Sequence, residues 1–166
     1  MHRNTTENQV QSSSTPVDLE LEAIVLGHAV SVGGSLGIPV NCFSFEAHRL
    51  IAETILEHEK RGRPIDMVSI LSTLRFKSAG WVAHDLARVF DSYSDADRPS
   101  IFHARRWLLG LARVRELQNA CALAFAELGD TSSDLEERIA AADGRLFPAL
   151  EAAKDAAIAL EEADIG

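Results

Sequence analysis

The sequence predicts an all-α protein, in which a small helical bundle is followed by a long αα-hairpin. Successive segments repeat apolar residues at the three- and four-residue spacing of an α-helix, and short turns rich in Gly and Pro separate them. Residues 101–128 contain neither proline nor a cluster of helix-stopping residues. At about 1.5 Å per residue, such a helix would extend roughly 40 Å, which is longer than a small core can cover.

Length and composition indicate one domain with tails. The chain has 166 residues, of which 46% are hydrophobic, enough to bury a core. Residues 1–15 are polar and are expected to be disordered. We expect the bundle to span 16–98, the hairpin 99–148 and an acidic, helix-prone tail 149–166. Without a long apolar run or a signal-peptide core, the chain is expected to be cytoplasmic, with no membrane contact.

The first predicted helix begins after Asp18, whose side chain can cap it. Its apolar face carries Leu21, Ile24, Val25 and Val32. The glycine-rich stretch that follows, up to Cys42, is expected to form a loop.

Two further helices meet at the turn R-G-R-P-I-D. The second predicted helix runs from about 45 to 60 and ends at Gly62, which suits a left-handed cap. Pro64 blocks its continuation, and Asp66 can cap the third helix. That helix is expected to bury Val68, Ile70, Leu71 and Leu74. A fourth helix, from about 79 to 90, offers Trp81, Leu86, Val89 and Phe90 to the core before the polar break at 91–99.

The hairpin is predicted from the last third of the chain. Apolar residues of 101–128 step by three, four or seven positions, a spacing suited to a partner helix. Residues 129–133 form the turn, and Asp134 with Glu137 resembles a capping box. The second arm carries Leu135, Ile139, Ala142 and Leu146, and Pro148 is expected to kink or end it.

Three segments resemble the N-terminal domain of the DnaB-type replicative helicases. The first, PVDLELEAIVLG at 16–27, looks like that family's opening P-x-N-x-E-A-E-x-x-V-L-G. The second is similar to its F-Y-x-x-x-H-x-x-I segment at Phe43, Ala47, His48, Leu50 and Ile51, with Ser44 in place of the tyrosine. The third matches its R-G-x-P-x-D-x-V turn at Gly62, Pro64, Ile65, Asp66 and Val68.

The resemblance implies a helical bundle plus hairpin whose hairpins pair between subunits, forming a collar and a docking surface. Homodimers or larger homo-oligomers, primase, helicase or a helicase loader are the partners it implies, with weak or indirect DNA contact. No G-x-x-x-x-G-K-[ST] phosphate loop occurs in the sequence, so no ATPase activity is assigned to it. We predict a non-enzymatic module with no catalytic residue, cofactor or metal, and we expect His48 to be a structural residue.

The predicted self-association surface lies on the hairpin, because a helix that outruns its bundle leaves apolar side chains exposed. Burial of one Leu or Phe contributes about 1.5 to 3 kcal/mol, so a few could hold a dimer. The candidates are Trp107, Leu108, Leu111, Val114, Phe125, Leu128, Leu135 and Ile139.

Other readings remain open. The chain could be a helicase segment acting as collar and primase dock, or a free-standing regulator that joins a full-length helicase ring. Only a regulator should alter unwinding at substoichiometric amounts. A third reading is a nucleic-acid-binding protein that uses Arg105, Arg106, Arg113 and Arg115, and it requires salt-sensitive affinity. The helicase-binding domain of primase has a related fold and is a further alternative.

Overall fold

A computed structural model describes residues 18–77, 80–95 and 101–162. Within these ranges the regular structure is helical, as the sequence predicts. The elements in chain order are α1 (Leu19–Val32), η1 (Val40–Cys42), α2 (Glu46–Lys60), α3 (Met67–Phe76), η2 (Gly80–Val82), α4 (Ala83–Asp95), α5 (Ile101–Gly129) and α6 (Leu135–Glu162). The tail expected to be disordered, 1–15, lies outside the described residues.

Side-chain caps begin three of the helices where the sequence predicts them. Asp18 accepts a hydrogen bond from the backbone N–H of Leu21 at 3.0 Å, and Asp66 accepts from those of Val68 and Ser69 at 2.9 Å. Asp134 accepts from the N–H of Glu137 at 2.9 Å. Each cap satisfies a donor that the first helical turn leaves without a partner.

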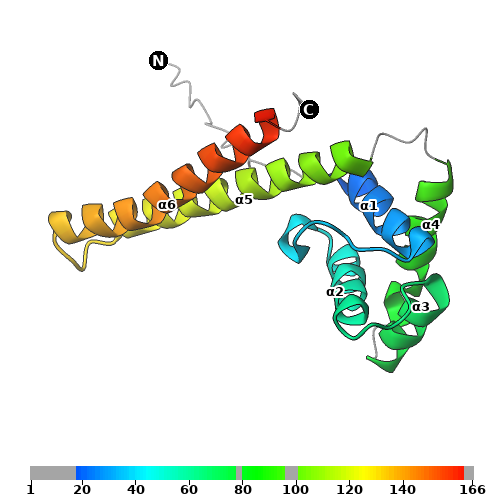
Figure 1. The fold of residues 1–166 in the computed structure, drawn as a ribbon. Helices are drawn as coiled ribbons and strands as arrows, with labels where there is room; N and C mark the ends of the chain where they lie inside the picture. The colour runs from blue at the N-terminus through cyan, green and yellow to red at the C-terminus, as the bar shows by residue number, and fades with distance from the viewer. Residues whose placement is uncertain (1–17, 78–79, 96–100, 163–166) are drawn as a thin grey trace, which may run out of the picture.

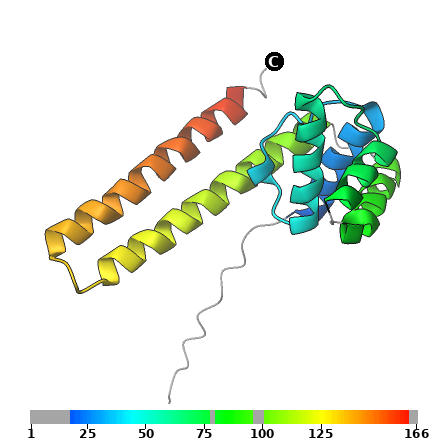
Figure 2. The ribbon, with the colours of Figure 1, turned by 90° about the horizontal axis from the view of Figure 1, so that it is seen from below.

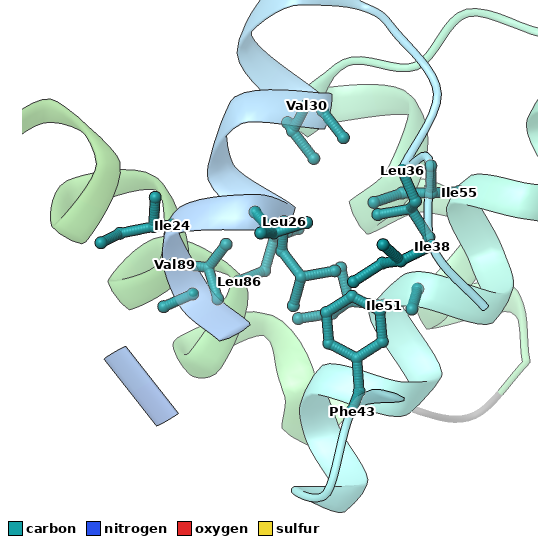
Figure 3. Close-up of a cluster of buried hydrophobic side chains, with 14 of the residues drawn as sticks. Ile24, Leu26, Val30, Leu36, Ile38, Phe43, Ile51, Ile55, Leu86 and Val89 are labelled. Atoms are coloured by element: carbon teal, nitrogen blue, oxygen red, sulfur yellow. The ribbon is translucent and has the colours of Figure 1, made fainter. Parts of the chain in front are cut away.

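The core is centred on α1, whose side chains contact elements on two sides (Figure 3). Leu26 is fully buried, with Leu86 and Val89 of α4 on one side and Ile51 of α2 on the other. The segment between α1 and η1 adds Leu36 and Ile38 to the same cluster. This predicted loop is therefore part of the core.

Helices α1 and α4 are in close contact, and α4 is longer than the sequence predicts. The polar break was expected at 91–99, but α4 continues to Asp95. Tyr93 is buried, and its hydroxyl lies 3.3 Å from Nδ1 of His28 on α1. A methyl group on Gly27 would lie 2.5 Å from Cβ of Tyr93, so the helices approach at a position without a side chain. Residues 96–99 of the expected break lie outside the described ranges.

His58 holds together the corner between α2 and α3. Its Nδ1 donates to the carbonyl of Pro64 at 2.6 Å, because a carbonyl can only accept. Its Nε2 lies 2.8 Å from Oγ1 of Thr73. Gly62 takes the left-handed conformation predicted for it, with φ of 61°.

The hairpin extends away from the bundle (Figure 1). Helix α5 begins against α1, leaves the bundle and turns at 130–134, and α6 returns beside it (Figure 2). Pro148 lies inside α6, which is continuous to Glu162, so the expectation that the helix could end there is wrong. Residues 149–162 belong to the second arm of the hairpin.

Three side chains expected in the core are exposed instead. Val32 is 57% exposed, Val68 77% and Trp81 56%. Each lies near the end of its helix or in a short turn, where no neighbouring element covers the face that the apolar spacing indicated. No helix among the described residues is long and apolar enough to cross a membrane.

Candidate self-association surface on the hairpin

The N-terminal half of α5 has one face inside the bundle. Ala104, Leu108 and Ala112 are buried there, at the four-residue spacing of one helix side. Leu108 is fully buried, so its assignment to the self-association surface is wrong. Leu111 is half-buried and packs against the edge of the same core.

A second face of α5 is covered by α6 through small side chains. Ala120 and Ala124 of α5 and Ala142 of α6 are buried between the two helices. Arg145 forms an ion pair with Glu127 at 2.7 Å, which joins the arms near the turn. The hairpin therefore closes on alanines, and it leaves the larger apolar residues of α5 for other contacts.

A third face of α5 is left largely open by the bundle and by α6, with Leu111 at its border with the bundle core. Trp107 is 59% exposed, Val114 46%, Phe125 76% and Leu128 41%. Positions 107 and 125 are 18 residues apart, or about five full turns, so they lie on one line along the helix. We call this face the open stripe; it comprises Trp107, Leu111, Val114, Gln118, Cys121, Phe125 and Leu128.

Helix α6 adds apolar residues on the same side of the hairpin. Leu135 is 60% exposed and Ile139 46%. On α6, Ile139 and Leu150 lie to one side of the row of residues that faces α5. On α5, Cys121 and Val114 are displaced in the same rotational sense from the row that faces α6. Because the two helices are antiparallel, residues displaced in the same sense lie on the same side of the hairpin. The open stripe and these residues therefore form one broad surface.

Sequence reasoning missed two exposed residues of α6, Phe147 at 67% and Leu150 at 43%. The signal was present, since Leu150 follows Ile139 by 11 residues, or about three turns. It was overlooked because Pro148 was interpreted as the limit of the helix.

The arginines proposed for nucleic-acid binding are used within the molecule. Arg105 donates to the carbonyl of Ser35 at 2.8 Å, and Arg115 donates to that of Cys42 at 2.7 Å. Both bonds hold the core loop onto α5. Arg113 pairs with Glu116 at 2.6 Å, and Arg106 is half-buried. These four residues do not form an open basic face.

His48 belongs to a buried polar cluster around Glu22. The Glu22 carboxylate is fully buried, and it accepts hydrogen bonds from Nδ1 of His48 at 2.9 Å and from the N–H and hydroxyl of Ser44 at 2.7 and 2.5 Å. Burial alone raises the pKa of Glu22, but the bonds from His48 and Ser44 outweigh it, so the pKa lies below its ordinary value. The cluster ties α1 to the start of α2, the structural role expected for His48.

Other reactive groups do not gather into a site among the described residues. Burial raises the pKa of Cys42 to about 11, which keeps this thiol protonated at neutral pH. No group of three or more His, Cys, Asp or Glu in the described ranges could hold a metal ion.

Comparison with known proteins gives a likeness of fold. No family model matches the chain, and no curated protein matches its sequence. Among solved structures, it is similar to the crystal structure of the N-terminal domain of DnaB helicase from Mycobacterium tuberculosis. The TM-score is 0.63 at 20% sequence identity, over 80% of this chain and 98% of the other. The chain therefore has the fold of a DnaB helicase N-terminal domain, as its sequence motifs predict.

Proposed function

We propose that this protein is a non-catalytic oligomerisation and docking module of the replicative-helicase N-terminal type, acting in DNA replication. The observation that carries the proposal is the open stripe, whose large apolar residues Trp107, Val114, Phe125 and Leu128 are exposed. Isolated exposed apolar residues are ordinary on protein surfaces, but a continuous apolar face is typical of an interaction site.

The broad surface formed by the open stripe and the exposed residues of α6 approaches the size of a specific interface. From 107 to 128 the helix extends about 32 Å, and two helices side by side are roughly 20 Å wide, so the face covers about 600 Å² in outline. Its accessible area exceeds its outline, and a stable interface needs about 800 Å² from each partner.

A second copy of the chain is the partner that this surface fits best. Of the seven positions of the stripe, six are apolar or cysteine and Gln118 is uncharged, while the sequence carries a formal net charge of −9. A face without charge lets two acidic copies approach each other where repulsion is smallest. The proposed docking partners are primase, a helicase or a helicase loader. Support for these partners comes from the fold likeness, on which this part of the proposal depends.

Replacing both Val114 and Phe125 with Asp should convert the dimer to a monomer. Each substitution removes apolar burial worth about 1.5 kcal/mol or more and places a carboxylate in the interface, so dimer affinity should fall at least about 100-fold. Light scattering on an eluting column measures the mass, and circular dichroism verifies the helices. Both side chains point away from the core, so folding should be preserved.

Leu123→Asp is the matched control, because Leu123 lies on α5, is 41% exposed and is outside the stripe. It should leave the dimer intact. A wild-type chain that elutes as a monomer at high concentration would contradict the proposal, as would equal loss of dimer in the control.

A further inference from the structure

A second exposed apolar face lies on the bundle, along the outer side of α3. Val68, Ser72 and Phe76 are exposed there at the four-residue spacing of one helix side. Phe76 is 91% exposed, the highest value among the large apolar residues that the structure describes. Trp81 is exposed in η2, which packs against α3. Helix α3 lies in the part of the bundle away from the hairpin, so this face is separate from the open stripe (Figure 1).

The surroundings of this face are basic, although the chain as a whole is acidic. Residues 57–77 contain five Lys and Arg against three Asp and Glu, whereas the whole chain has a formal net charge of −9. One carboxylate, that of Glu57, pairs with both Arg61 and Lys77. This shared partner holds the turn that follows α2 beside the C-terminal end of α3, next to Phe76.

Three cations of this region are available to a partner. Lys60, Arg63 and Arg75 are exposed, and among the described residues none of them forms an ion pair or a side-chain hydrogen bond. Asp66, the acid closest to them in the turn, is already used in capping α3. Together with the apolar residues they form what we call the α3 face, which comprises Lys60, Arg63, Val68, Arg75, Phe76 and Trp81.

We propose that the α3 face is a docking site for an acidic, amphipathic segment of a different protein. The apolar side chains of that segment cover Val68, Phe76 and Trp81, and its carboxylates pair with the three free cations. Charge complementarity selects this partner, because a positive patch with apolar centres attracts a chain that carries both features with the opposite charge. The proposal goes beyond the proposed function, since it assigns a second surface and a partner chemistry that do not depend on self-association.

The size of the face indicates a transient contact. Its two aromatic residues and one valine, with the adjoining cations, offer on the order of 400 to 500 Å² to a partner. A stable interface buries about 800 Å² on each side. We therefore expect a dissociation constant of about 10 to 100 μM.

A protein segment fits this face better than a nucleic acid or a membrane. Val68 presents an aliphatic side chain, on which a base cannot stack, and a long strand would extend beyond the patch over a chain of net charge −9. Three free cations are fewer than the four to eight that are typical of clusters that bind anionic lipids. A short acidic segment meets only the local positive charge.

The experiment measures binding of a labelled synthetic peptide to the full chain by fluorescence anisotropy. The peptide is a helix of about 16 residues, with Leu and Phe on one side, Glu on the other and a net charge of about −6. Phe76→Ser should weaken its binding at least about tenfold, because the central apolar contact is lost. Phe147→Ser is the matched control, since Phe147 is also exposed but lies on α6, and it should leave the affinity unchanged. Equal effects of the two substitutions, or no binding of the peptide at about 1 mM, overturn the proposal.

A charge reversal tests the role of the cations. Arg75→Glu should weaken binding several-fold at low salt and much less at about 1 M salt, where charges are screened. Lys154→Glu, the same change on an exposed side chain of α6, should have little effect. A peptide with Lys in place of every Glu should bind at least about tenfold more weakly than the acidic one. Equal binding of the two peptides overturns the proposal.

Two competing ligands and one variant complete the test. Tighter binding of a thymidine oligonucleotide of about 20 residues, or of phosphatidylserine vesicles, that is lost in Phe76→Ser would assign the face to nucleic acid or to a membrane and overturn the proposal. The Val114→Asp, Phe125→Asp variant should bind the acidic peptide as the wild type does. Loss of binding in that variant would show that the peptide site requires the hairpin, which also overturns the proposal and leaves self-association untouched.

Discussion

At the scale of single residues, Glu22 shows how one buried carboxylate organises the bundle. Its oxygens accept from two consecutive residues at the start of α2, Ser44 and Phe45, whose N–H groups lie before the first turn. The cap residue of α2, Phe45, makes no side-chain cap hydrogen bond. The carboxylate from α1 instead fixes the two residues that lead into α2.

The lowered pKa of Glu22 makes stability depend on pH in a defined direction. Its folded pKa lies below the ordinary 4.5, so the stabilisation is complete above that value and is lost as the pH falls through the folded pKa. Glu22→Gln should cost about 2 to 3 kcal/mol at neutral pH, because buried hydrogen bonds to a charged group are lost. Urea denaturation should show this difference shrinking as the pH falls through the lowered pKa of Glu22, where the wild-type carboxyl becomes protonated. A difference that stays constant with pH would show that Glu22 acts through shape alone.

Gly27 sets the distance between α1 and α4. An added methyl group would meet Cβ of Tyr93 at 2.5 Å and the carbonyl oxygen of Val89 at 2.6 Å, and backbone cannot rotate away. Gly27→Ala should therefore lower the free energy of unfolding by about 1 to 3 kcal/mol, although alanine favours helices. Gly144→Ala in α6 is the matched control, since nothing lies within 4 Å of its added methyl. Thermal melts should show the control unchanged or stabilised, and equal loss in both would contradict the packing argument.

At the scale of elements, signals that act within a few residues were predicted best. Asp18, Asp66 and Asp134 cap their helices as expected, and Gly62 adopts its left-handed turn, because each depends on its immediate neighbours. The end of α4 was predicted too early, since the polar sequence after Phe90 favours a break. Tyr93 contacts His28, which lies 65 residues earlier in the chain, so no local sequence pattern indicates this contact.

The faces of α5 show what apolar periodicity leaves undetermined. The spacing identified a long helix with apolar residues, but not which row meets which neighbour. Leu108 and Val114 were assigned to one surface, yet Leu108 lies in the core and Val114 is exposed. The alanines that pack against α6 did not stand out in the apolar pattern of the sequence. They contribute a small side chain that lets the two helices pack closely, rather than a large apolar area. Arg105 and Arg115 were equally ambiguous, since their acceptors are carbonyls some 70 residues earlier in the chain.

At the scale of the whole molecule, the charge is concentrated away from the open stripe. Residues 127–166 contain 11 acidic and three basic residues, and most of this segment forms the second arm of the hairpin. Two copies that pair through their hairpins bring these acidic arms close together. The apolar stripe must then overcome a repulsion that acts across solvent and depends on ionic strength.

Added salt should therefore strengthen self-association. Raising the ionic strength from about 0.01 M to about 1 M shortens the screening length from about 30 Å to about 3 Å, which removes most of the repulsion between exposed acids. Sedimentation equilibrium should show the dimer dissociation constant falling several-fold over this range, while the Val114→Asp, Phe125→Asp variant stays monomeric throughout. Association that weakens with salt would instead indicate ion pairs between α5 arginines and α6 acids of the second copy. The same titration separates the module from a nucleic-acid-binding protein, because affinity for a phosphate backbone falls steeply as salt rises.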